Sequence, residues 1–141
     1  MEAGKIIKEV RAHLIEATRL LDTELSAEIP ETEYIACIQC IRKYPAFRKD
    51  FALLLITMYE NREIFYDTVS YLMFVLRWKE IYIWAEYKRD TVDYPITYAK
   101  PYIEILDAYS DSWEYHYYYS YVLEERTRQI EIDKANLTLC E

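Results

Sequence analysis

The scarcity of glycine constrains the fold of this chain more than any other feature. Gly4 is the only glycine, and four prolines accompany it in 141 residues. Hairpins in sheet proteins lean on residues that tolerate positive φ, and glycine is the main one. Hydrophobic residues make up 52% of the chain, which is enough to bury a real core. The composition therefore predicts an all-α fold in a single compact domain.

Hydrophobic spacing predicts six or seven helices within one domain over residues 1–135, followed by a loose tail over residues 136–141. The first helix shows one apolar stripe at alternating spacings of four and three, formed by Ala3, Ile7, Val10, Leu14, Ala17 and Leu21. Pro30 suits the first turn of a second helix. Tyr44, which precedes Pro45, should end it, because a residue before proline is pushed out of helical geometry.

The central part of the chain is the most apolar. Residues 45–62 are apolar nearly all round at their centre, so we expect this helix to be the most buried. Residues 62–90 predict two helices, or one with a bend near Arg77 and Trp78. Their β-branched and aromatic content leaves some strand in residues 64–85 as an alternative. Helix pairs of similar length would suit a HEAT-like arrangement.

Negative charge is concentrated in the C-terminal third. The net charge is −8, with 14 acids and 13 bases in residues 1–89 but 11 acids and 4 bases in residues 90–141. A surface of that sign repels nucleic acid and attracts basic proteins. We expect a basic protein as partner and no direct contact with nucleic acid. Acidity that serves only solubility is the alternative.

The sequence gives no sign of export or membrane insertion. The N-terminal segment mixes charges through its apolar positions, unlike a signal peptide. No run of about 18 apolar residues predicts a membrane span. We therefore expect a cytoplasmic protein that makes no membrane contact.

Residues that could catalyse a reaction or bind a metal are few and poorly spaced. Cys37 and Cys40 form a C-x-x-C pair, but inside a predicted helix rather than at a helix N-terminus. Zinc would need two further ligands with matching spacing. Carboxylate pairs such as Asp107 and Asp111 occur, but spacing alone does not give them the unlike environments of acid–base catalysis. We expect no enzyme activity, no catalytic residue, no cofactor and no metal.

The stretch SWEYHYYYSYVLEER, residues 112–126, carries six aromatic rings and three glutamates. If residues 113–130 form one helix, one side gathers apolar core residues, and aromatic rings recur at every fourth position on the other side. Tyrosine and tryptophan dominate the energetics of protein interfaces, and carboxylates steer basic partners. Burial of both sides is the alternative. The partner-binding residues that we expect are Trp113, Glu114, Tyr117, Tyr121, Glu124 and Glu125.

Two resemblances bear on function. The segment YLMFVLRWKEIYIWAEYK, with Arg77 and Trp78 at a helix junction, resembles helical segments of small HEAT-like bacterial proteins. In size, charge and composition the whole chain resembles the small acidic all-helical immunity proteins of bacterial toxin systems, including contact-dependent growth inhibition. That second resemblance implies binding to one cognate toxin, often a basic nuclease, and blockage of its active site. It transfers no residue role.

These observations together predict a binding protein that neutralises a basic partner, most concretely an immunity protein that occludes the active site of a toxin nuclease. An acidic DNA mimic that inhibits a nucleic-acid-binding protein is an alternative, and a helical adaptor or structural module is another. Neither the partner nor the oligomeric state follows from the sequence.

Overall fold

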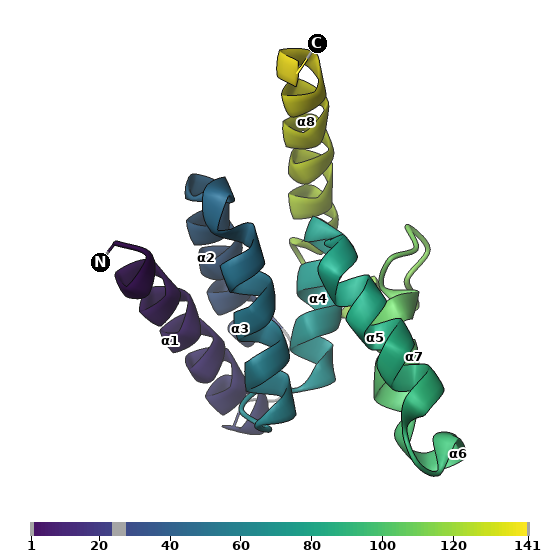
Figure 1. The fold of residues 1–141 in the computed structure, drawn as a ribbon. Coiled ribbons are helices and arrows are strands. Elements are labelled where there is room, and N and C mark those ends of the chain that lie inside the picture. Colours follow the sequence, from purple (N-terminus) through teal and green to yellow (C-terminus); the bar gives the residue numbers. More distant parts are fainter. Residues whose placement is uncertain (1, 24–27, 141) are drawn as a thin grey trace.

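The computed structural model describes residues 2–23 and 28–140, and these form eight α-helices and two 3-10 helices, with no strand among them (Figure 1). The elements are α1 (Glu2–Thr23), α2 (Glu28–Lys43), η1 (Pro45–Phe47), α3 (Arg48–Glu60), α4 (Tyr66–Leu76), α5 (Lys79–Thr91), α6 (Pro95–Tyr98), α7 (Lys100–Asp107), η2 (Glu114–Tyr118) and α8 (Val122–Cys140). The all-α prediction is confirmed. The strand alternative for residues 64–85 is wrong, and the helix beyond the expected seven is the four-residue α6.

The N-terminal helices pack along the predicted stripe. Val10, Leu14 and Ala17 of α1 are almost fully buried, and α1 contacts α2 and α3. Figure 1 shows these three helices side by side. Tyr44 separates α2 from η1, as the following proline predicts.

The most buried segment is α4 rather than α3. Every residue from Thr68 to Leu76 is buried, whereas Leu53 of α3 is 64% exposed. The reason is position, because α4 contacts α2, α7 and α8 and so has neighbours on several sides. A helix that is apolar all round can be buried all round only at the centre of the domain.

Helices α4 and α5 are separate, which resolves the choice between two helices and one bent helix. Arg77 adopts a left-handed backbone conformation (φ 53°, ψ 48°) and ends α4, with its N–H donated to the carbonyl oxygen of Met73. Trp78 follows in an extended conformation as the N-cap of α5. The hydroxyl of Tyr109 donates to the Trp78 carbonyl oxygen at 2.6 Å and ties this junction to the segment after α7.

The C-terminal helix departs from expectation at both ends. It begins at Val122 rather than near residue 113, and it continues to Cys140 through most of the expected loose tail; Glu141 lies outside the described residues. Figure 1 shows α8 rising out of the body. Nowhere in the described part of the chain is a helix both long and apolar enough to cross a membrane.

Candidate functional site

The aromatic segment, residues 113–121, connects α7 to α8 and is not an α-helix. Its centre is the 3-10 helix η2, and Tyr119 follows it in an extended conformation (φ −124°, ψ 136°). Aromatic residues lose side-chain freedom in a helix, so a run of them gives little local support to helical geometry. The prediction of one α-helix with two aromatic sides is therefore wrong. The directions of the side chains follow instead from the 3-10 helix and the extended residue after it.

Two rings of the segment face the core. Trp113 is 4% exposed and packs on Phe74 of α4, with ring centroids 5.3 Å apart. Tyr119 makes an edge contact with the ring of Tyr71, with centroids 4.8 Å apart. These contacts fix the segment against α4. They also correct the expectation that Trp113 faces a partner, because its ring is buried.

A buried carboxylate holds the end of the segment in place. Glu31 of α2 is 0% exposed and accepts the hydroxyl of Tyr71 at 2.6 Å. It also accepts the backbone N–H of Ser120 at 2.9 Å and that of Tyr121 at 3.2 Å. The N–H groups of Ser120 and Tyr121 donate to Glu31 and therefore do not donate to carbonyl oxygens four residues earlier, as a helix running through this segment would require. This contact explains why α8 begins only at Val122.

Glu125 is the second expected partner-binding residue that lies inside. It is 1% exposed, and Arg42 of α2 donates to its carboxylate at 2.6 Å. Arg128, one turn further along α8, also donates to it. The guanidinium of Arg42 also donates to the backbone carbonyl oxygen of Glu125, at 2.9 Å. Glu125 thus joins α8 to α2, because burial of its charge requires such partners.

The other four expected residues are exposed. Tyr117 is 81% and Tyr121 is 52% exposed, and Glu114 and Glu124 also lie on the surface. Glu124 forms an exposed ion pair with Arg128, four residues further on. Tyr121 and Glu124 lie at the start of α8. The six predicted residues therefore do not form one face.

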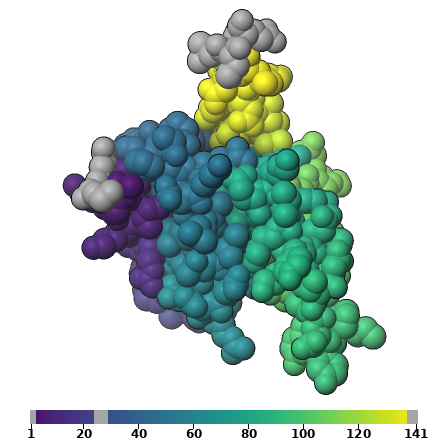
Figure 2. Space-filling view, viewed as in Figure 1, coloured from purple at the N-terminus to yellow at the C-terminus, as the bar shows by residue number. Residues whose placement is uncertain are grey.

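The structure instead gathers a set that we call the tyrosine–carboxylate surface, made of Glu104, Asp107, Glu114, Tyr115 and Tyr118; Tyr117 belongs to the same 3-10 helix as the last three. Both Tyr117 and Tyr118 are highly exposed, at 81% and 65%. The rings of Tyr115 and Tyr118 stack with centroids 5.9 Å apart. Figure 2 shows part of this segment, in yellow-green, at the molecular surface beside the base of α8.

Three carboxylates of this surface lie around a shallow cavity. Glu104 and Asp107 of α7 and Glu114 of η2 line a space of about 400 Å³, together with Tyr115. Within the described residues none of the three forms an ion pair. They are therefore available to cationic groups outside the chain.

The titration behaviour of these groups reflects crowded negative charge. Partial burial raises the pKa of Glu104, and the charge of Asp107 raises that pKa further. The charge of Glu104 in turn raises the pKa of the Tyr115 hydroxyl. A cation placed in the cavity would relieve this repulsion.

Glu104, Asp107, Tyr115 and Tyr118 are not among the partner-binding residues predicted from the sequence. The i, i+3 spacing of Glu104 and Asp107 does place both on one side of a helix, which is the signal that could have found them. Tyr115 would lie on the core side of a helix over residues 113–130, and that helix does not form. Its outward position depends on η2, and no periodicity in the sequence indicates a 3-10 helix there.

The remaining candidates for chemistry are structural. Cys37 and Cys40 are free thiols in the hydrophobic core. Burial raises the pKa of the Cys37 thiol, the opposite of what an activated nucleophile requires. Nδ1 of His13 lies 2.6 Å from the Glu33 carboxylate and links α1 to α2. No three histidine, cysteine, aspartate or glutamate side chains in the described ranges converge to hold a metal ion.

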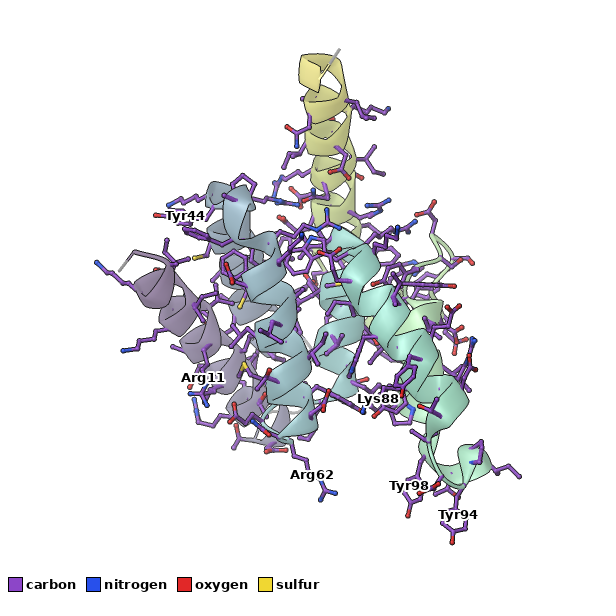
Figure 3. All side chains as sticks on the ribbon, viewed as in Figure 1. Arg11, Tyr44, Arg62, Lys88, Tyr94 and Tyr98 are labelled. Carbon is purple, nitrogen blue, oxygen red and sulfur yellow. The ribbon has the colours of Figure 1, made fainter. Side chains whose placement is uncertain are left out.

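A second exposed apolar region lies at α6. Ile96 is 100% exposed, Tyr94 is 75% and Tyr98 is 57% exposed. Figure 3 shows the two tyrosines pointing away from the body at the tip of this short helix. The cavity lined by Glu104, Asp107 and Glu114 contains no residue of α6. Exposed residues at this tip can therefore serve as controls for the site.

Comparison with known proteins adds no relative. The chain matches no protein-family model, no curated protein and no solved structure.

Proposed function

We propose that the protein neutralises a basic partner protein by covering its cationic surface, most concretely the substrate cleft of a toxin nuclease, as an immunity protein does. The observation that carries this proposal is the tyrosine–carboxylate surface, where exposed rings lie beside carboxylates that have no ion-pair partner in the described chain. Rings of this kind supply contact area, and carboxylates supply charge complementarity.

The rigidity of the segment supports a binding role. Trp113 is buried against α4, and Glu31 holds the backbone of Ser120 and Tyr121. A segment fixed before it meets its partner loses less conformational entropy on binding. Tyrosine also adds large contact area with few rotatable bonds, which lowers that entropic cost again.

A nuclease cleft suits this surface on electrostatic grounds. Nucleases bind phosphates through lysine and arginine, so their clefts are cationic. The carboxylates of Glu104, Asp107 and Glu114 would occupy positions that phosphates otherwise take. Inhibition would then result from occlusion of the cleft, with no chemical step by the inhibitor.

The test uses the intact protein as bait and compares it with the double variant Glu114→Lys/Tyr117→Ala. We expect the wild-type protein to capture a basic protein, which is then purified and assayed for nuclease activity with and without the inhibitor. The double variant should bind that protein at least about 100-fold more weakly, because it removes one ring and reverses one charge at the proposed contact.

Tyr94→Ala is the matched control. Tyr94 is 75% exposed, close to the 81% of Tyr117, but it lies on α6 (Figure 3). We expect this variant to bind and inhibit as the wild type does. Equal binding by the double variant and the wild type would remove the site assignment. Capture of a partner without nuclease activity would remove the nuclease identification.

A further inference from the structure

An arginine-lined cavity lies at the base of α8, in a molecule that is otherwise strongly acidic. It has a volume of about 550 Å³, and α2, the start of α3, the junction of α4 with α5, and α8 all contribute to its wall. Figure 1 shows these segments converging where α8 leaves the body. Four arginines line it, Arg42, Arg48, Arg77 and Arg126, with Asp133 as the single carboxylate of the lining.

Two of these arginines have donors to spare. Arg77 donates to Asp111, and Arg126 donates to the carbonyl oxygen of Val75 at 3.0 Å. The Nε–H groups of both arginines are buried, and neither has a hydrogen-bond acceptor among the described residues. The nearest carboxylate oxygen to Arg126 Nε belongs to Asp111, at 3.9 Å. A buried charged donor without an acceptor is costly, so the pairing of these two guanidinium groups within the described protein is incomplete.

The other two arginines are held by the protein. Arg42 is paired with Glu125, and Arg48 forms an exposed ion pair with Glu80. Asp111 pairs with both Arg77 and Arg126, so on that side of the cavity one carboxylate faces two guanidinium groups. Burial lowers the pKa of Arg126, and the neighbouring charge of Arg77 lowers it further, which shows how closely the two cations lie.

The backbone of Arg77 adds an independent observation. The residue that ends a helix in the left-handed conformation is usually glycine, because a side chain costs energy there. Arg77 adopts that conformation with φ at 53°. Strain of this kind is concentrated at functional sites. Here it places a guanidinium at the cavity.

We propose that this cavity binds a small molecule that carries a phosphate group. The planar fork of each guanidinium matches phosphate oxygens. A doubly charged phosphate balances more of the positive lining than a single carboxylate does. This site is independent of the partner surface proposed above.

The walls indicate that the phosphate is attached to an organic group. Pro45, Leu76, Trp78 and Ile132 also line the cavity and give it an apolar side. Its volume falls within the range of about 300 to 1,000 Å³ that is typical of small-molecule sites. A nucleoside monophosphate has the required combination of a phosphate with an apolar-faced ring.

The experiment titrates the full-length protein with inorganic phosphate, with adenosine 5′-monophosphate and with adenosine. Calorimetry gives the affinity, and ¹H–¹⁵N spectra of the arginine Nε–H groups report directly on Arg77 and Arg126. We expect both phosphate compounds to shift these two resonances, the nucleotide to bind more tightly than inorganic phosphate, and adenosine not to bind.

Arg48→Gln and Arg11→Gln form a matched pair of variants. Each removes one exposed ion pair, because Arg48 is bonded to Glu80 and Arg11 to Glu63, with side-chain exposures of 47% and 45%. Only the first lines the cavity; Figure 3 shows Arg11 on α1. We expect Arg48→Gln to weaken nucleotide binding about tenfold, as for one charge-assisted hydrogen bond, and Arg11→Gln to leave it unchanged.

A second variant tests the buried donors. Arg126→Lys keeps the positive charge but removes the Nε–H and the fork, so we expect a further loss of about tenfold or more. If this variant does not fold, the Arg48 and Arg11 comparison and the wild-type spectra still decide. Unmoved Nε–H resonances, equal weakening by Arg48→Gln and Arg11→Gln, or equal binding of adenosine would overturn the proposal. Tighter binding of a single-stranded oligonucleotide than of the mononucleotide would replace it with a nucleic-acid site.

Discussion

The inner and outer sides of the aromatic segment use the same residue types in opposite ways. On the inner side, Trp113 packs on Phe74, and the carboxylate of Glu31 accepts the Tyr71 hydroxyl and the backbone N–H groups of Ser120 and Tyr121. On the outer side, Tyr117 is 81% exposed and Glu114 has no ion-pair partner among the described residues. One ring and one carboxylate stabilise the fold, and their exposed counterparts add no contact to the interior.

This difference shows what decides the role of an aromatic or acidic residue. A buried carboxylate stabilises a protein only when donors surround it, and Glu31 meets that condition. An exposed carboxylate among other carboxylates adds repulsion and no internal bond. Several such carboxylates beside exposed rings are therefore consistent with the binding role proposed above.

The largest predicted effect is the difference in stability between removing the buried ring of Trp113 and removing the exposed ring of Tyr117. Trp113→Ala should lower the free energy of unfolding by about 3 to 5 kcal/mol, because it leaves a cavity against α4. Tyr117→Ala should change it by no more than about 0.5 kcal/mol, as is usual for an exposed side chain. Urea unfolding followed by circular dichroism measures both. Similar losses for the two variants would contradict the division into inner and outer sides.

Removal of the charge of Glu31 should have the next largest effect. In Glu31→Gln one side-chain oxygen becomes an NH₂ group, which would face the Tyr71 hydroxyl or the backbone donors. We expect a loss of about 2 to 3 kcal/mol, since a buried donor is then left without an acceptor. Hydrogen exchange should also speed up at the amides of Ser120 and Tyr121.

Glu114→Gln is the control for this variant, because it makes the same chemical change at an exposed carboxylate. It should alter stability by less than about 0.5 kcal/mol. If Glu31→Gln leaves hydrogen exchange in the segment unchanged, then Glu31 does not hold the start of α8.

Helices that pack by a regular apolar periodicity could be predicted from the sequence. Features that depend on one distant side chain, such as the start of α8, could not. Val10, Leu14 and Ala17 follow the stripe of α1 because a helix repeats its face every 3.6 residues. The start of α8 depends on Glu31, about 90 residues earlier in the chain, and no local pattern indicates that contact. The expected exposure of Trp113 and Glu125 failed for the same reason.

Charge distribution could be predicted better than the geometry of the site. Glu104, Asp107 and Glu114 all belong to the acidic C-terminal third, but described carboxylates without an ion pair, such as Glu9 and Asp50, also lie outside it. Which acids remain unpaired could not be predicted, because that depends on tertiary contacts such as those of Arg42 with Glu125 and Arg77 with Asp111.

A smaller effect is predicted for the hydroxyl that bonds to Glu31. Tyr71→Phe removes one donor at 2.6 Å from the carboxylate and leaves the buried ring in place. We expect a loss of about 1 to 2 kcal/mol, the range for one hydrogen bond to a charged group. Thermal unfolding measures it. A loss as large as that of Glu31→Gln would mean that the hydroxyl, rather than the backbone donors, dominates the anchor.

The smallest predicted effect has the opposite sign and belongs to the outer side. Partial burial and the charge of Asp107 raise the pKa of Glu104 in the folded protein. An acid whose pKa is raised on folding destabilises the protein when it is ionised, and that cost fades as the pH falls through the folded-state pKa. Glu104→Gln should therefore stabilise the protein at pH 7, by no more than about 0.5 kcal/mol because solvent screens a partly exposed group.

The pH dependence distinguishes this explanation from a packing effect. The gain from Glu104→Gln should disappear at about pH 4, where the wild-type carboxyl is largely protonated. Lys5→Gln provides a control on α1, away from the tyrosine–carboxylate surface. It should show no gain in stability at pH 7. A gain that persists at low pH would assign the effect to packing. A loss of stability at pH 7 would show that Glu104 stabilises the fold. Glu104 would then have to be removed from the residues proposed to contact a partner.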